Sequence, residues 1–354
     1  MKTITKARLE MRPLRSAVLF GLFAFAAVAA HAQTGPHPIH VPLTVSETAV
    51  GTYKASLAVR IGNLALIPFE FDTGSTGLHV FADVSFTGSN TGIRCTRTAT
   101  SVTYGNPARM IFHGVMCHAT LQIGPLATAR PVPIAYLTSA QCAPSAPSGC
   151  KPPDVSSFKD MHSYGVFGAG LAGVIHGQGV APPPLLSLPG RYGQVYSIAL
   201  TPSSGELILG GHAPQGAAVF HLIKTNGSSR AEWKQGKACL FVNEEPIDAC
   251  LIISFDTGNG VPWLHNVTSS LLPLHGNRIK LVRSGTHIGF APPNADLPAT
   301  SVIAGGEFWN RIQDASVANG RIMTNTSIQV FFDHFVTYDA EYGIISFAPA
   351  GFSE

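Results

Sequence analysis

Two stretches of the chain, Phe69-Glu-Phe-Asp72-Thr73-Gly74-Ser75 and Ile253-Ser-Phe-Asp256-Thr257-Gly258-Asn259, repeat one pattern that decides the expected fold. In each stretch an apolar run ends in Asp-Thr-Gly. The distance along the chain from Asp72 to Asp256 is close to the length of one domain. Two such triplets in matching contexts indicate that the chain consists of two related halves.

The rest of the sequence favours strands over helices. Short apolar runs bounded by Gly, Pro or Ser occur at residues 55–61, 194–200 and 206–209, whereas runs with helical periodicity are scarce. Short bounded runs of this kind are typical of strands, so we expect an all-β fold. A turn-rich break at residues 201–205 predicts the boundary between the halves. We expect one lobe over residues 33–202 and a second over residues 203–354.

Residues 1–32 resemble a signal peptide. A cationic stretch ends at Arg15, an apolar run covers residues 16–30, and Ala30-His31-Ala32 has the small-x-small pattern of a cleavage site. The apolar run is short for a membrane span, so an uncleaved anchor is the less favoured alternative. We expect residues 1–32 to be removed and the remainder to be exported, either periplasmic or secreted, with no stable membrane span.

Composition excludes several classes of function. The chain has 354 residues, of which 45% are hydrophobic and 12% charged, so it can bury a large core and is not disordered. Without residues 1–32 it keeps 18 basic and 19 acidic residues. A balance so close to neutral gives no reason to expect a nucleic-acid or anionic-membrane partner.

The cysteine count fits an oxidising compartment. The six cysteines are Cys95, Cys117, Cys142, Cys150, Cys239 and Cys250, and none belongs to a C-x-x-C motif. An even number in an exported chain indicates disulfides, although six cysteines allow 15 connectivities. Proximity in the sequence favours the pairs 95–117, 142–150 and 239–250.

The repeated triplet also predicts chemistry. An aspartate at the end of a buried strand is costly unless its charge is satisfied, and a glycine two residues later lets backbone amides approach it. If the two loops face each other, their like-charged carboxylates share one proton at mildly acid pH. One carboxylate then acts as a base on a water molecule, and the other acts as an acid toward a carbonyl oxygen. The pattern therefore predicts amide hydrolysis by Asp72 and Asp256 without a metal or cofactor.

Six segments in the same order resemble the pepsin-like aspartic proteases, over most of the sequence after residue 32. They are Phe71-Asp-Thr-Gly-Ser-Thr-Gly-Leu78, Thr103-Tyr104-Gly105, Gly165-Val-Phe-Gly168, Gly205-Glu-Leu-Ile-Leu-Gly-Gly211, Phe255-Asp-Thr-Gly258 and Val336-Thr-Tyr-Asp339 with Gly343-Ile-Ile-Ser-Phe-Ala-Pro349. The resemblance implies a bilobal all-β fold with a cleft between the lobes. It also implies a peptide or protein substrate; we expect a monomer.

The resemblance assigns roles to residues around the two aspartates. It implies that Tyr104 and Gly105 lie on a flap over the substrate. Thr73 and Thr257 would brace the two loops, each of which turns at its glycine, Gly74 or Gly258. It also implies that Ser75 donates a hydrogen bond to the outer oxygen of Asp72.

Departures from the family pattern concentrate near the same site. Asn259 replaces the usual Ser or Thr, and its amide is expected to donate to Asp256 instead. His79 replaces a common Trp, and it either bonds Tyr104 or lies at the surface. Glu70 precedes Asp72 by two residues on the same strand face, so it either raises the proton affinity of the pair or, as we favour, reaches solvent. The segment 325–328 lacks the glycine that residues 165–168 have.

Other motifs carry less weight. The pattern Gly168-Ala-Gly170-Leu-Ala-Gly173 matches a dinucleotide-binding loop, but no acidic residue follows at the required distance. His113, Cys117 and His118 suggest a metal site only weakly, because Cys117 is expected to be oxidised.

The motifs and the departures from them leave two functions to weigh, an aspartic endopeptidase and a non-catalytic binding protein on the same scaffold. Contact between the two carboxylates favours the enzyme, and a gap favours the binding protein.

Overall fold

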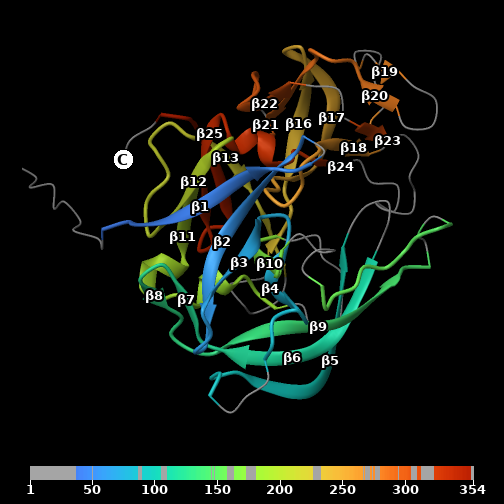
Figure 1. The fold of residues 1–354 in the computed structure, drawn as a ribbon. Coiled ribbons are helices and arrows are strands. Elements are labelled where there is room, and N and C mark those ends of the chain that lie inside the picture. Colours follow the sequence, from blue (N-terminus) through green and yellow to red (C-terminus); the bar gives the residue numbers. More distant parts are fainter. Residues whose placement is uncertain are drawn as a thin grey trace, which may run out of the picture. The chain divides into compact units, whose positions relative to one another are not determined.

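The computed structural model describes residues 37–49, 51–86, 90–104, 110–144, 146, 148–157, 163–172, 181–225, 233–265, 267, 272, 274–275, 280–293, 295–303, 309–311 and 323–351, with backbone only at 248–249, 274–275, 280 and 309–311. The predicted signal peptide and Gly105 lie outside these residues. Residues 36–354 cluster as one compact unit. Figure 1 shows its strands, and among the described residues the only helical elements are three short 3-10 turns. The expected all-β class is confirmed.

The first half contributes strands that pack on both sides of the first Asp-Thr-Gly loop. Their bounds are β1 (Ile39–Glu47), β2 (Tyr53–Ile61), β3 (Leu66–Asp72), β4 (Thr76–Phe81), β5 (Arg94–Tyr104), β6 (Met110–Ala119), β7 (Leu121–Ile123), β8 (Leu126–Ala127), β9 (Val132–Cys142) and β10 (Gly165–Ala169). Buried and exposed residues alternate along β1, as expected for a half-buried strand, whereas β10 is buried throughout.

The second half runs from the middle of the chain to residue 349. Its elements are η1 (Pro184–Ser187), η2 (Gly190–Gly193), β11 (Val195–Thr201), β12 (Ser204–Leu209), β13 (Ala218–His221), β14 (Ile223–Lys224), β15 (Trp233–Lys234), β16 (Lys237–Val242), β17 (Glu245–Ser254), β18 (Trp263–His265), β19 (Leu274–His275), β20 (Lys280–Val282), β21 (His287–Ala291), β22 (Thr300–Ile303), β23 (Trp309–Arg311), β24 (Met323–Asn325), η3 (Ile328–Phe331), β25 (His334–Asp339) and β26 (Ile344–Pro349).

The two halves repeat one strand topology. In the first half the described strands are ordered β8-β7-β2-β3-β10-β4-β9-β6-β5, and in the second they are ordered β22-β21-β16-β17-β24-β18-β23-β20-β19. The parallel pairs fall at equivalent places, β3 with β10 and β4 with β9, then β17 with β24 and β18 with β23. The internal repeat read from the Asp-Thr-Gly triplets is therefore a repeat of structure.

A set of six further strands, ordered β13-β26-β25-β11-β12-β1, continues the sheet of the first half. In Figure 1 the blue β1 lies beside the yellow-green β12, and the red β25 lies beyond β11. Strands from both sides of the predicted boundary at 202/203 thus share one sheet. The division into lobes at that residue stays a prediction.

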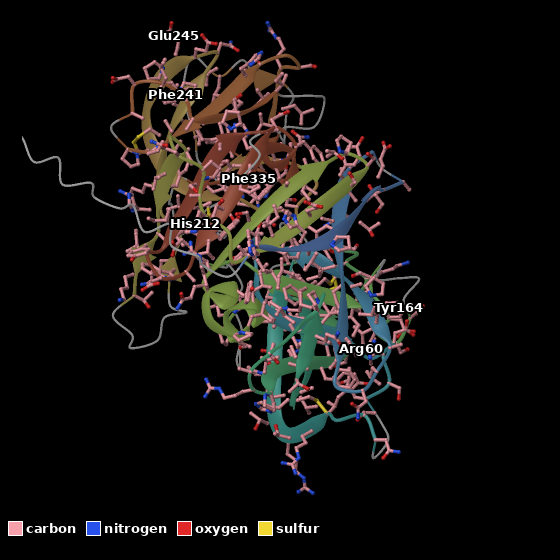
Figure 2. All side chains as sticks on the ribbon, turned by 90° about the vertical axis from the view of Figure 1, so that its left-hand side faces the viewer. Arg60, Tyr164, His212, Phe241, Glu245 and Phe335 are labelled. Atoms are coloured by element: carbon pink, nitrogen blue, oxygen red, sulfur yellow. A yellow bond between two sulfur atoms is a disulfide. The ribbon has the colours of Figure 1, made fainter. Side chains whose placement is uncertain are left out.

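Apolar side chains fill the interior between these strands. The largest fully buried ones include Phe71, Phe167, Tyr196 and Tyr338, all close to the two loops. Among the side chains in Figure 2, Phe241 of β16 is buried, whereas Arg60 of β2 is exposed. The described residues contain no helix of the length and apolar character needed to cross a bilayer.

The three disulfides are those favoured by sequence proximity, so that prediction is confirmed. Cys95–Cys117 joins opposed residues of β5 and β6, and Cys239–Cys250 joins opposed residues of β16 and β17. Cys142–Cys150 closes the loop that follows β9. Three disulfides fit a protein that folds in an oxidising compartment.

Candidate active site

The two Asp-Thr-Gly loops interlock through their threonines. The amide of Thr73 donates to Oγ1 of Thr257 at 3.1 Å, and the amide of Thr257 donates to Oγ1 of Thr73 at 3.0 Å. Each hydroxyl then donates across to the other half, Thr73 to the carbonyl of Phe255 at 2.9 Å and Thr257 to that of Phe71 at 2.6 Å. All four bonds are buried. The loops are therefore held face to face by reciprocal hydrogen bonds.

This arrangement brings the two carboxyl groups together. Both aspartates are 8% exposed, and each accepts a hydrogen bond from the amide two residues later, at 2.7 Å for Asp72 and 2.8 Å for Asp256. A Cβ on Gly74 would lie 2.2 Å from Cγ of Asp256, and one on Gly258 would lie 2.4 Å from Cγ of Asp72. Only glycine fits at these positions. Each carboxyl group therefore lies directly against the glycine of the opposite loop, which brings the two groups close together.

Burial and like charge keep a proton on this pair. Burial is the main reason that the pKa of Asp72 is raised well above its usual value, and the charges of Asp256 and Glu70 raise it further. Ser75 acts in the opposite direction and lowers the pKa of Asp72. Its buried Oγ nevertheless makes no well-aligned hydrogen bond to any described residue. The bond from Ser75 to Asp72 that the resemblance implies is therefore weak in this structure.

The second aspartate has a donor that the sequence pattern did not reveal. Nδ2 of Asn325, the last residue of β24, donates to Oδ2 of Asp256. Asn259, which we expected to provide this donor, instead donates to the carbonyl of Val261 at 2.6 Å. The register of β24 against β17 makes Asn325 the counterpart of Val166 on β10. The two aspartates therefore have chemically different neighbours.

The missing glycine of the second half is a strained serine. By the same register, Ser327 is the counterpart of Gly168, and it adopts a φ of 61°. A non-glycine residue at positive φ costs about 1–3 kcal/mol when the surroundings impose it. Ser327 is held there because its amide donates to Oδ1 of Asn325 at 2.9 Å. The strained backbone of Ser327 therefore occurs together with the hydrogen bond from the Asn325 side-chain amide to Asp256.

Tyr104, which we predicted to lie on a flap, is anchored by a buried histidine. Tyr104 is the last residue of β5, and its hydroxyl hydrogen-bonds Nδ1 of His79 on β4. His79 is 1% exposed, so the alternative of a surface histidine is wrong. Burial lowers the pKa of His79 to about 4 and raises the pKa of Tyr104 well above its usual value. Gly105, the other predicted flap residue, lies outside the described residues.

His79 is expected to limit stability at low pH. Because its folded-state pKa is about 4 against an ordinary 6.5, the unfolded chain binds more protons, and stability falls as the pH drops from 6.5 to 4. The loss approaches about 3 kcal/mol. Replacing His79 by Gln should remove that loss, measured as urea unfolding at pH 7 and pH 4. The exposed His287→Gln is the matched control, and an equal acid loss in His79→Gln would contradict the prediction.

Glu70 does not point freely to solvent as we favoured. Its side chain is 21% exposed and forms an ion pair with Lys54 of β2. The same ammonium group also donates to the carbonyl of Gly258 in the second loop. Lys54 was not singled out from the sequence, because a lysine in an alternating strand is usually a solvent-facing residue.

Two stacked tyrosines lie beneath the loops. The rings of Tyr196 and Tyr338 are 5.1 Å apart and nearly parallel. The hydroxyl of Tyr338 donates to the carbonyl of Phe255 at 3.4 Å, and the hydroxyl of Tyr196 donates to the carbonyl of Ala169, the last residue of β10. This pair connects the central strands to both halves of the site.

The weakly suggested metal site loses one of its ligands. Cys117 is bonded to Cys95 and is not available as a thiolate. Within the described part of the chain, no group of three His, Cys, Asp or Glu side chains is arranged to bind a metal ion.

Comparison with known proteins identifies the fold. The chain aligns with the crystal structure of an aspartic proteinase from Irpex lacteus, with a TM-score of 0.54 and 15% sequence identity, over 89% of this chain and 98% of that one. The chain has the pepsin-like fold. At sequence level no family model matches, and no curated protein matches either. Identity this low establishes the shared architecture and not a shared activity.

Proposed function

We propose that this chain is an exported aspartic endopeptidase that hydrolyses peptide bonds with Asp72 and Asp256. The observation that carries the proposal is that the two buried carboxyl groups face each other, each against the glycine of the opposite loop. An arrangement of this kind gives a general acid and a general base at one point, as peptide hydrolysis requires. The pepsin-like scaffold, which implies a peptide substrate, supports the same conclusion.

The neighbours of the two aspartates favour different roles for them. Asp256 accepts hydrogen bonds at both oxygens, from the amide of Gly258 and from Asn325, and donors of this kind stabilise negative charge. Because the pKa of Asp72 is raised well above its usual value, we assign the shared proton to Asp72. In the proposed reaction Asp256 removes a proton from water, the hydroxide adds to the peptide carbonyl carbon, and Asp72 protonates the carbonyl oxygen to give a gem-diol. Asp256 then passes its proton to the amide nitrogen, the C–N bond breaks to release the amine, and a hydroxyl of the gem-diol returns a proton to Asp72 as the carboxylic acid forms.

The remaining site residues support this reaction. Thr73 and Thr257 hold the loops together, and Gly74 and Gly258 allow the carboxyl groups to meet. We propose that Tyr104, supported by His79, closes over an extended peptide. Activity should be highest under acid conditions, because it is lost as the pH rises through the raised pKa of Asp72.

The alternative of a non-catalytic binding protein is not favoured by this geometry. It drew on the loss of Ser or Thr at position 259, on the missing glycine near position 327, and on the altered flap tip at residues 106–108, which lie outside the described residues. Asn325 supplies a donor to Asp256 in place of residue 259, and Ser327 adopts a glycine-like conformation. Neither of these two departures separates the carboxyl groups.

An acid digestion assay tests the proposal. The chain, purified with its three disulfides formed, should cleave an unfolded protein between pH 3 and 6, and a statine-type transition-state mimic should inhibit it. Cleavage sites read by mass spectrometry would give the flanking side chains, which we expect to be apolar. Binding of the mimic without any cleavage would instead support the non-catalytic protein.

A further inference from the structure

Lys54 reaches the catalytic region from the first half of the molecule. It lies near the start of β2, where neighbouring residues also touch the second half. Gly260 sits against Thr52, since a Cβ on that glycine would be 2.6 Å from Cβ of Thr52, and the ring of Tyr53 packs edge-on against Phe332 at 5.3 Å. These contacts fix the backbone from which the Lys54 side chain extends.

The ammonium group of Lys54 has two partners. It forms an ion pair with Oε1 of Glu70 and donates to the carbonyl of Gly258. Gly258 is the residue whose Cα lies against the carboxyl group of Asp72 and whose amide binds Asp256. A positive charge is therefore held at Gly258, the residue that contacts both catalytic carboxyl groups. The carboxylate of Glu70 neutralises this charge.

A cation at this place works against the proposed chemistry unless it is neutralised. An unpaired ammonium group beside two carboxyl groups favours their doubly ionised form, and this form lacks the proton that the reaction needs. An unpaired carboxylate at the same place disfavours the doubly ionised form and so helps the pair to keep its proton. The charges of Asp72 and Asp256 are already felt at Lys54, where they oppose the effect of burial and help to raise its pKa.

We propose that Glu70 is a positioning residue that holds Lys54 at the carbonyl of Gly258 and neutralises its charge, so that the ion pair sets the pH range over which the two aspartates keep their shared proton. This inference rests on the proposed endopeptidase function and adds to it a control of the same site. Other titratable side chains facing the pair are Tyr104 from β5 and Tyr338 from β25, with His79 of β4 behind Tyr104.

Three variants separate the two charges. Glu70→Gln frees Lys54, so activity should fall at least about tenfold, and the alkaline limb of the pH profile should move about one pH unit or more toward acid. Lys54→Met leaves Glu70 unpaired and should move that limb toward higher pH. The double variant removes both charges and should recover most of the activity lost in Glu70→Gln. Glu206→Gln, which breaks the exposed pair with His40, is the matched control and should leave the profile unmoved.

Opposite shifts in the two single variants support the inference. The inference would be overturned if the alkaline limbs of both single variants moved in the same direction or did not move. It would also be overturned if the double variant lost as much activity as the two single variants combined. A purely structural ion pair would lower activity equally at every pH, and this outcome also counts against the proposal.

A readout besides peptide cleavage separates this inference from the proposed function. Asp72 contributes a pH dependence to the free energy of unfolding, measured with urea from pH 3 to 7. That dependence should become weaker in Glu70→Gln and stronger in Lys54→Met. If the wild-type chain cleaves no peptide, the endopeptidase proposal fails. The charge coupling is tested separately, by the slopes of unfolding free energy against pH in the two variants. If the chain cleaves peptides and the slopes do not change, only the present inference fails.

Discussion

Asp72→Asn is expected to abolish peptide hydrolysis, with a loss of about a thousandfold or more. The amide cannot deliver the proton that we assign to Asp72, and proton transfer by a positioned side chain contributes about 10²–10⁴-fold. The substitution keeps the size of the side chain and the acceptor for the amide of Gly74. The rate at the acid optimum, normalised to folded protein, is the measurement. Asp154→Asn, which changes an exposed aspartate outside both Asp-Thr-Gly loops, serves as the control. Undiminished cleavage by Asp72→Asn would remove the proposed mechanism.

The same variant should be more stable than the wild type at neutral pH. The pKa of Asp72 is raised in the folded chain, so the folded state binds more protons than the unfolded state once the pH exceeds about 3.8. Wild-type stability therefore declines as the pH rises through this range, and Asn at position 72 removes the decline. Below pH 3.8 the two proteins should be equally stable. Urea unfolding at pH 3.5 and pH 7 gives the comparison.

Thr257→Val should damage both stability and activity. The hydroxyl of Thr257 donates to the carbonyl of Phe71 and accepts from the amide of Thr73, so an isosteric valine leaves two buried backbone groups unsatisfied. Each such group costs about 1–3 kcal/mol, for a combined loss of about 2–6 kcal/mol. The loops would also lose their mutual alignment, and small displacements of catalytic groups can lower the rate about a hundredfold.

A second threonine separates these two effects. Thr128 is buried and accepts a hydrogen bond from the amide of Leu121 at 3.0 Å, in the first half of the chain and away from both aspartates. Thr128→Val should lose about 1–3 kcal/mol of stability and keep the full rate per folded molecule. If Thr257→Val also keeps its full rate, the interlocked threonines are only structural.

The sequence was informative where a local pattern determines structure. Asp72 and Asp256 were found because each ends an apolar run and is followed by a glycine, and the geometry shows why no larger residue fits there. Two of the three disulfides join near neighbours because opposed residues of adjacent strands in a hairpin are close in sequence as well.

Contacts between distant strands could not be predicted in this way. Asn325 meets Asp256 only through the parallel pairing of β24 with β17, which no local pattern specifies. Asn259 follows the second Asp-Thr-Gly triplet as the family pattern requires, but its side chain donates to the carbonyl of Val261. Lys54 shares a strand with residues that alternate between interior and exterior, so its position gave no sign that it reaches the second loop.

The pairing of β11 with β25 has a consequence for how the chain matures. Val195 pairs with Asp339, and Tyr196 with Tyr338, although most of the second half lies between them in the sequence. Such long-range pairing forms late in folding, because the entropy of closing the loop must be overcome first. A nascent chain without residues 334–349 lacks Tyr338 beneath the carbonyl of Phe255. In the proposed endopeptidase, hydrolytic activity should therefore arise only once the final strands have docked.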